Sequence, residues 1–295
     1  MVLWVDSSRT DTTKVVNVAS VSQHSPFRYP GGKTWLIPRI RQWLISIPRP
    51  DKLIEPFAGG AIVGLTAAFE VLVGQVILVE KDEQVASVWQ TIINDQEGAK
   101  WLAKQIVEFQ LSSETAKELL AQVSGNNREK AFQTIVQNRI NHGGILAPSA
   151  GLLKNGENGK GILSRWYPQT LAKRVTKIGE IHERLKFIEG DGLDVIRKFQ
   201  NDINIVFFVD PPYTASAKKA GTRLYKYHQL DHEHLFHEMS LVKGDFLMTY
   251  DDADEVRALA KNFHFETRAI AMKNKHHTKL DELLIGKDLS WLGNK

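Results

Sequence analysis

Apolar and polar positions change along the chain with periods that predict alternating strands and helices. Four short apolar runs predict strands, at Lys52–Glu55, Gln75–Val79, Lys186–Glu189 and Ile203–Val209. Helical spacing is expected at Ala61–Leu72, Glu83–Ile93, Leu193–Phe199 and Asp231–Leu241, and late strands at Phe246–Thr249 and Glu282–Ile285. The run at Ile203–Val209 is apolar apart from Asn204, as in a strand buried on both faces. The alternation predicts an α/β fold with a parallel sheet between helices.

The middle of the chain follows a different pattern. Glu97–Ile140 is amphipathic and helical, and Gly143–Gly161 then holds six glycines among nineteen residues, which is typical of a functional or mobile loop. We expect residues 97–175 to be a mainly helical insertion, with residues 25–96 and 176–295 forming the core domain. Residues 1–24 lack a signal-peptide pattern, and we expect them to be a flexible leader.

Composition narrows the class of protein. The 295 residues include no cysteine, so disulfides are excluded and a cytoplasmic protein is expected. Cytosine-C5 methylation, which needs a cysteine nucleophile, and zinc-dependent base deamination, which uses cysteine ligands, are both disfavoured. No apolar run reaches the roughly 18 residues of a membrane span.

Positive charge is concentrated although the net charge is only +4. Residues 28–50 and 214–230 contain basic side chains and no acidic ones, and residues 138–177 contain seven basic side chains against the single acid Glu157. Solvated faces would explain any one of these patches. Three of them close to the candidate motifs favour a polyanion such as nucleic acid.

The strand at Ile203–Val209 delivers four candidate catalytic residues, Asp210, Pro211, Pro212 and Tyr213, to the ligand-binding edge of the sheet. The amino nitrogen of adenine is a poor nucleophile because its lone pair is delocalised. Hydrogen bonds to the Asp210 carboxylate and the Pro211 carbonyl would localise it, and the prolines would hold these acceptors in place. Tyr213 offers a ring on which a flipped base can stack. A plain Pro-Pro turn is the alternative.

A candidate nucleotide-binding turn follows the first predicted strand. Its cofactor-binding candidates are Glu55, Pro56, Phe57, Gly59 and Gly60. Glu80 ends the next strand, where a carboxylate can accept both hydroxyls of a ribose such as that of S-adenosylmethionine (SAM). Asp191 follows the third strand and could accept the adenine amino group of SAM, or could simply bind its own turn.

Two other segments resemble a phosphate-binding loop and a metal site, but neither has the required spacing. Gly31-Gly32-Lys33-Thr34 is similar to part of a phosphate-binding loop, but Phe27 stands where that loop needs glycine. The histidines after Asp231 do not follow a metal-binding spacing, so we expect no metal and predict that Asp231 caps a helix.

Taken in order, the motifs resemble the Dam-like class of SAM-dependent DNA adenine-N6 methyltransferases. The matching pieces are Tyr29-Pro-Gly-Gly-Lys33, Glu55-Pro-Phe-Ala-Gly-Gly60, Glu80, Asn138-Arg139 and Asp210-Pro-Pro-Tyr213. The resemblance implies a Rossmann-like methyltransferase sheet with a target-recognition insertion. It also implies that Tyr29, Lys33, Glu80 and Asp210 contact SAM, and that Asp210 to Tyr213 hold a flipped adenine.

This chain departs from typical members at two places. It has Glu80 where they have Asp, although either side chain can bind a ribose. The residues after Arg139 do not resemble those of GATC-reading members, so that recognition sequence cannot be carried over. Double-stranded DNA is the expected partner, with DNA-binding candidates Arg139, Arg165, Lys218, Lys219 and Arg223.

Other substrates and roles stay open at this stage. RNA adenine, cytosine N4 and a protein amide present the same lone-pair problem to the catalytic loop. A catalytically silent nucleic-acid-binding module would need only the basic patches. A partner of a cognate restriction endonuclease, a phage enzyme and an orphan regulator remain the biological alternatives.

Overall fold

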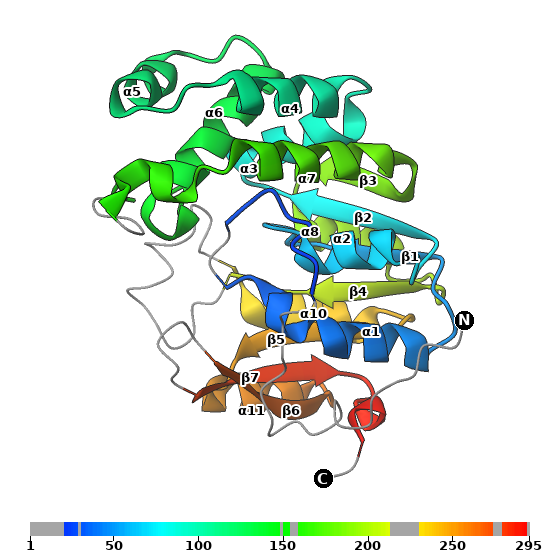
Figure 1. Cartoon of the computed structure of the whole chain (residues 1–295). Coiled ribbons are helices and arrows are strands. Elements are labelled where there is room, and N and C mark those ends of the chain that lie inside the picture. The colour runs from blue at the N-terminus through cyan, green and yellow to red at the C-terminus, as the bar shows by residue number, and fades with distance from the viewer. Residues whose placement is uncertain are drawn as a thin grey trace.

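The computed structural model describes residues 21–28, 31–147, 150–153, 159–212, 230–273 and 279–293, with a seven-stranded sheet at the centre (Figure 1). The strands lie in the order β3-β2-β1-β4-β5-β7-β6. Their bounds are β1 Lys52–Glu55, β2 Gln75–Glu80, β3 Leu185–Glu189, β4 Ile205–Val209, β5 Phe246–Asp251, β6 Glu266–Lys273 and β7 Lys279–Gly286. Strands β1 to β5 are parallel, and β7 is antiparallel to both β5 and β6. The predicted α/β sheet is confirmed.

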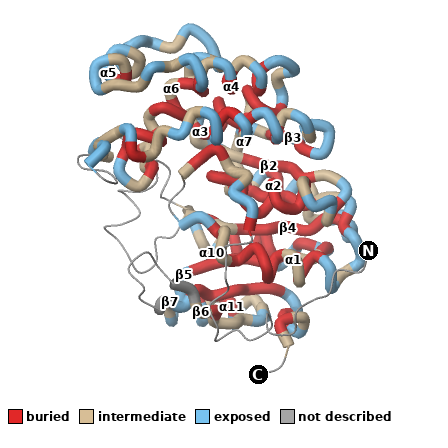
Figure 2. The backbone as a smooth tube through the Cα atoms, in the orientation of Figure 1, coloured by how far each residue is buried: buried red, intermediate tan, exposed pale blue. Residues whose placement is uncertain are grey.

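Alternate residues of each central strand face two separate apolar layers. In β4, Val206 and Phe208 pack on one side, and Ile205, Phe207 and Val209 pack on the other. The first layer is closed by α1 (Ile37–Ser46), α2 (Ile62–Phe69) and α3 (Glu83–Trp89). The second is closed by α8 (Gly192–Phe199), α10 (His232–Leu241) and α11 (Asp254–Asn262). Figure 2 shows the buried strands between these helices, so both sheet faces are removed from water.

The predicted insertion contains four helices at the β3 end of the sheet (Figure 1). They are α4 (Gly98–Glu108), α5 (Ser113–Ala121), α6 (Asn127–Ile140) and α7 (Pro168–Glu180). The segment predicted as one helical stretch is therefore divided, because Ser112 and Asn126 each cap a new helix with their side chains. Leu102 and Ile135 join the same apolar cluster as Val76 of the sheet. The limits of a separate recognition domain stay a prediction.

Short helical turns connect the main elements. They are η2 (Lys33–Leu36), η3 (Gln90–Asn94, a π-helix), η4 (His142–Gly144), η6 (Gly161–Arg165), η7 (His182–Arg184) and η8 (Ser290–Leu292). The described end of the predicted leader lies on the core, where Val21 is buried and the His24 ring stacks on Phe69 at 4.1 Å between centroids. No helix within the described ranges has both the length and the hydropathy to cross a bilayer.

Candidate active site at the carboxyl edge of the sheet

Asp210 lies where β4 ends, beside the ends of its parallel neighbours. Its Oδ1 atom accepts a hydrogen bond from Thr249 Oγ1 at 2.8 Å and lies 2.9 Å from Lys33 Nζ. Thr249 belongs to β5, the strand next to β4. Pro211 follows Asp210 and is buried, and Pro212 is half-buried. The predicted catalytic carboxylate is thus fixed by two donors from separate parts of the chain.

Lys33 connects Asp210 to a second carboxylate. Its Nζ atom lies 2.8 Å from Glu282 Oε1 and donates to the Gly31 carbonyl at 3.0 Å. The side chain is only 3% exposed. Burial by itself lowers the pKa of Lys33, but the carboxylates of Asp210 and Glu282 outweigh it and raise the pKa above its ordinary value. Lys33 is therefore charged and holds two acids at the end of the sheet.

The sequence motifs missed Thr249 and Glu282. Glu282 lies on β7, opposite Asp251 of β5, and is 5% exposed. Neither residue belongs to a short motif, since both reach the site through strand pairing across the sheet. A polar residue inside an otherwise apolar strand was the available signal, as for Thr249 between Met248 and Tyr250.

The turn after β1, predicted to bind a nucleotide, has an unusual backbone conformation. Gly59 has φ 45° and Ala61 has φ 51°, so the chain enters α2 through two left-handed residues. The Gly59 amide donates to Glu80 Oε2 at 2.9 Å, and the Gly59 carbonyl accepts from Trp89 Nε1 at 2.9 Å. Pro56 and Gly60 are buried and Phe57 is half-buried. The turn is thereby joined to the end of β2.

Glu80 is held by backbone amides on both of its oxygens. Besides Gly59, the amides of Lys81 and Asp82 donate to Oε1, each at 2.9 Å. Burial raises the pKa of Glu80, and these amide bonds offset part of that effect. The carboxylate is consequently fixed at the end of β2, and its role in binding a ribose stays a prediction.

Glu55 ends β1 and is 3% exposed. Its Oε2 atom accepts from the Gly64 amide of α2 at 2.8 Å. Burial raises the pKa of Glu55 well above its ordinary value, and the charges of Asp210 and Glu80 raise it further, against the Gly64 bond. A side chain at position 64 would meet Glu55 Oε2 at 2.7 Å, so only glycine fits there. Glu55 therefore joins the end of β1 to α2 through its bond to the Gly64 amide.

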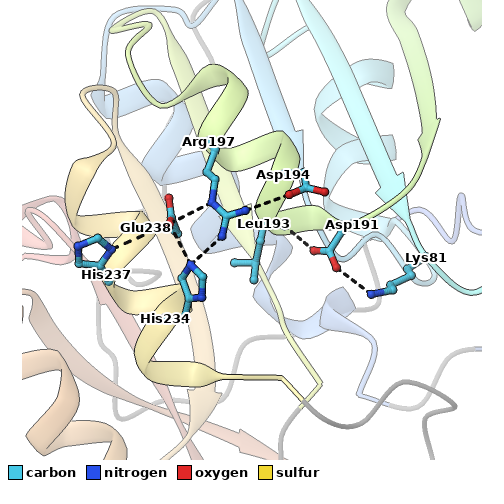
Figure 3. A network of polar contacts seen from close by, with 8 residues as sticks. All are labelled: Lys81, Asp191, Leu193, Asp194, Arg197, His234, His237 and Glu238. Atoms are coloured by element: carbon cyan, nitrogen blue, oxygen red, sulfur yellow. Dashed lines mark hydrogen bonds and ion pairs between the residues drawn. The ribbon is translucent and has the colours of Figure 1, made fainter.

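Asp191 caps α8 with its side chain, as the turn alternative anticipated. Oδ1 accepts from the Leu193 amide at 2.9 Å, and Oδ2 forms an ion pair with Lys81 Nζ at 2.8 Å (Figure 3). Burial raises the pKa of Asp191, but Lys81 and the Leu193 amide outweigh it and lower the pKa below its ordinary value. The next residue, Gly192, approaches the Pro56 carbonyl so closely that a Cβ atom would lie 2.4 Å from it. The two predicted cofactor turns are thus in contact.

The histidine-rich start of α10 forms an ion-pair network with α8. The Arg197 guanidinium contacts Asp194, Glu238 and His234 at 3.0, 3.1 and 2.7 Å (Figure 3). Asp231 accepts from the His234 amide at 3.0 Å, so the predicted helix cap is confirmed. The described ranges contain no group of three or more His, Cys, Asp or Glu side chains arranged to hold a metal ion.

The predicted DNA-binding residues fall into different settings. Arg139 is 7% exposed, and its guanidinium donates to the Pro26 carbonyl, so this structure does not present it to a base edge. Arg165 is half-buried at the end of η6. Five predicted site residues lie outside the described residues: Tyr29, Tyr213, Lys218, Lys219 and Arg223.

The seven-stranded sheet between two layers of helices is a Rossmann-like fold of the kind found in SAM-dependent methyltransferases. Residues 29–147 match the model of the D12 class N6 adenine-specific DNA methyltransferase family, which confirms the resemblance drawn from the motifs. SAM is therefore the methyl donor, and DNA is the substrate that the family match implies. The matched range contains the Lys33 segment, the turn after β1, Glu80 and Asn138-Arg139.

Solved structures with a similar arrangement have low sequence identity. A SAM-dependent methyltransferase from Agrobacterium tumefaciens is 10% identical with a TM-score of 0.40, and the match covers 86% of this chain and 60% of that one. A precorrin-6y C5,15-methyltransferase from Geobacter metallireducens is 8% identical with a TM-score of 0.36, covering 84% of each chain. An rRNA methyltransferase from Streptomyces viridochromogenes is 14% identical with a TM-score of 0.39, covering 98% and 94%. No curated protein gives a significant match.

Proposed function

We propose that the chain transfers a methyl group from SAM to N6 of an adenine flipped out of double-stranded DNA, within one recognition sequence. The position of Asp210 carries the proposal. This carboxylate ends the buried strand β4, is followed by Pro211-Pro212, and is held at Oδ1 by Lys33 and Thr249. The match of residues 29–147 to adenine-specific DNA methyltransferases supports adenine in DNA over the other amine substrates.

The protein has to make the adenine amino nitrogen nucleophilic, although its lone pair is delocalised into the ring. The Asp210 carboxylate and the Pro211 carbonyl would accept the two N6–H bonds and localise the nitrogen lone pair. Bound SAM supplies an electrophilic methyl group on a sulfonium sulfur. N6 then bonds to the methyl carbon as the carbon–sulfur bond breaks, with the bonding electrons left on sulfur. Asp210 stabilises the positive charge on N6 until a proton leaves for solvent.

The two turns beside Asp210 fit the methyl donor. Glu80 would accept the ribose hydroxyls, and the turn from Pro56 to Gly60 would lie along the cofactor backbone. Where Gly192 packs on Pro56, the two turns meet through their backbones, with no room for a side chain at position 192. Asp191 would accept the adenine amino group of SAM, for which Lys81 has to release its Oδ2 atom.

The Lys33 ion pairs suggest a different role from the SAM contact implied by the family. Because Lys33 is buried between Asp210 and Glu282, we assign it to holding the catalytic carboxylate. A charged lysine there fixes the Asp210 carboxylate in the position from which it would accept from N6.

Methyl transfer from labelled SAM to unmethylated plasmid DNA tests the proposal. Asp210→Ala is expected to abolish transfer and to leave most DNA binding intact. Asp202→Ala is the matched control, since Asp202 is exposed before the opposite end of β4 and should retain full activity. Full activity of Asp210→Ala would contradict the assigned mechanism.

The product identifies the substrate class. Mass spectrometry should find N6-methyladenine, and single-molecule sequencing should find it in one repeated context. N4-methylcytosine, methylated RNA or a methylated protein amide would instead replace the proposed substrate. A single methylated context would also name the sequence that a cognate restriction endonuclease would cut.

A further inference from the structure

A short segment before the Lys33 motif lies against the recognition helices through three separate contacts. Arg174 of α7 donates from Nη1 to the Ser25 carbonyl at 3.1 Å, and Arg139 of α6 donates to the Pro26 carbonyl. Asn138 bonds both the amide and the carbonyl of Arg28 at 2.9 Å. Segments more than 100 residues apart in the sequence therefore meet here, and each brings an arginine.

Arg139 lies at the centre of this group without a carboxylate partner among the described residues. It is 7% exposed, and its buried Nε atom has no hydrogen-bond partner. Burial lowers the pKa of Arg139 to about 9, and the positive charges of Arg174, Arg28 and Arg165 add to that effect. No ion pair within the described ranges neutralises Arg139 or Arg174. A buried guanidinium among like charges is costly unless an anion offsets it.

We propose that Arg139 and Arg174 form a binding site for a backbone phosphate of the DNA substrate. This inference rests on the proposed function, and it assigns these arginines to phosphate rather than to base edges. A guanidinium has five N–H donors, and each carbonyl contact uses one of them. The remaining donors have the planar arrangement that binds phosphate oxygens.

The location suits the phosphate of a nucleotide close to the flipped base. Arg28 precedes Lys33 by five residues, so its Cα atom lies within about 18 Å of the residue that holds Asp210. The region from residue 138 to 177 also has a charge of +6, from seven basic residues and one acid. A phosphate bound here would fix the strand next to the catalytic loop without reading its sequence.

Arg174 offers the sharpest test because it is half-buried and has a single assigned contact with Ser25. Arg174→Gln removes the charge and retains an N–H donor for the Ser25 carbonyl, whereas Arg174→Lys retains the charge. Arg49→Ala is the matched control, because Arg49 is exposed, donates to the Val73 carbonyl at 3.0 Å, and lies before β1 at the opposite edge of the sheet.

Fluorescence anisotropy with a labelled duplex would give the DNA affinity at several salt concentrations. Arg174→Gln should weaken binding about tenfold on any sequence and reduce the slope of log K against log salt by about 0.9. Arg174→Lys should retain most of the slope, and Arg49→Ala all of it. SAM affinity and melting temperature report whether each variant is folded.

The outcomes separate this inference from the proposed function. An unchanged slope in folded Arg174→Gln, or a loss confined to one DNA sequence, would overturn the phosphate site while leaving the methyltransferase proposal intact. Failure of the unaltered protein to methylate a duplex that it binds, together with the expected slope change, would overturn the proposed reaction and retain the phosphate site.

Discussion

The side-chain amide of Asn138 pairs with the backbone of Arg28 as a neighbouring strand would. Oδ1 accepts from the Arg28 amide, and Nδ2 donates to the Arg28 carbonyl, both at 2.9 Å. Nδ2 also donates to the Gly144 carbonyl at 2.6 Å. One buried side chain thus joins the start of the Lys33 segment to α6 and to the glycine-rich loop. Its position explains why this asparagine belongs to the motif set.

Replacing Asn138 should therefore destabilise the packing of α6 on the Lys33 segment and on the glycine-rich loop. Asn138→Ala removes three hydrogen bonds and leaves buried backbone groups unpaired, which should lower the free energy of unfolding by about 3 kcal/mol. Asn94→Ala is the control, because Asn94 is exposed and makes one bond, to the Phe187 carbonyl at 3.1 Å. Urea unfolding measures both, and equal losses would contradict the assigned role of Asn138.

Thr249 should affect catalysis more than cofactor binding. Thr249→Val keeps the shape of the side chain but removes the hydrogen bond to Asp210 Oδ1, so kcat should fall about tenfold. Thr249→Ser retains the hydroxyl and should keep most of the activity. SAM affinity measured by calorimetry should be the same in both variants. A parallel loss of SAM binding in Thr249→Val would show that the threonine shapes the cofactor site instead.

Lys33 should contribute to stability because it lies between the buried Glu282 and the half-buried Asp210. Lys33→Met leaves Asp210 and Glu282 without their shared cation and should cost about 3–5 kcal/mol. Adding Glu282→Gln removes one of the two charges and should recover part of this loss. Lys81→Met breaks a more exposed ion pair with Asp191 and should cost less than about 1 kcal/mol. Chemical denaturation of the four proteins, including the unaltered one, would measure the comparison.

Glu55 predicts a pH dependence of stability with a definite sign. Its folded pKa is raised above the ordinary value of 4.5 by burial, so the native state holds the proton more tightly than the unfolded chain does. The contribution of Glu55 to stability is therefore present below the unfolded pKa and is lost as pH rises through the folded pKa.

Glu55→Gln removes this titration while keeping an acceptor for the Gly64 amide. The melting temperature of the variant should exceed that of the unaltered protein by more at about pH 8 than at about pH 5. A difference that shrinks with rising pH would mean that Glu55 is ionised in the folded protein.

Strong periodicity predicted the central strands well, and tertiary context determined the remaining elements. The predicted bounds of β1 agree with the structure, and those of β2, β3 and β4 differ by one or two residues, because their apolar runs end at polar turns. Among the described helices and strands, α1, α7, α11 and β6 were not predicted. Strand β6 has the sequence Glu-Thr-Arg-Ala-Ile-Ala-Met-Lys and lies at the edge of the described sheet, paired with β7. Its charged residues, which are typical of edge strands, interrupt the apolar pattern by which a strand is predicted.

The candidate site could be predicted only where its residues follow one another along the chain. Asp210, Pro211 and the glycine turn form local motifs, whereas Thr249 and Glu282 meet Asp210 and Lys33 through the pairing of β4, β5 and β7. The burial of Arg139 against the Pro26 carbonyl was not predicted, because it arises from the packing of α6 on residues 25–28. Burial of this kind depends on which helix packs on which segment. The pattern of apolar and polar residues in a single sequence does not show that packing.

The glycine-rich loop after α6 is closed at its base by the Asn141–Leu152 bridge. The His142 amide donates to the Gly151 carbonyl, and the Leu153 amide donates to the Ile140 carbonyl, both at 2.8 Å. The bridge closes residues 142–151, the first part of the loop, and within it the Gly144 and Ile145 carbonyls are also held by Asn138 and Asn141. Lengthening such a loop adds little closure entropy, about 0.6 kcal/mol for a doubling. Insertions after Ile145 are therefore compatible with the closed base, so the length of this stretch can change while the catalytic scaffold is preserved.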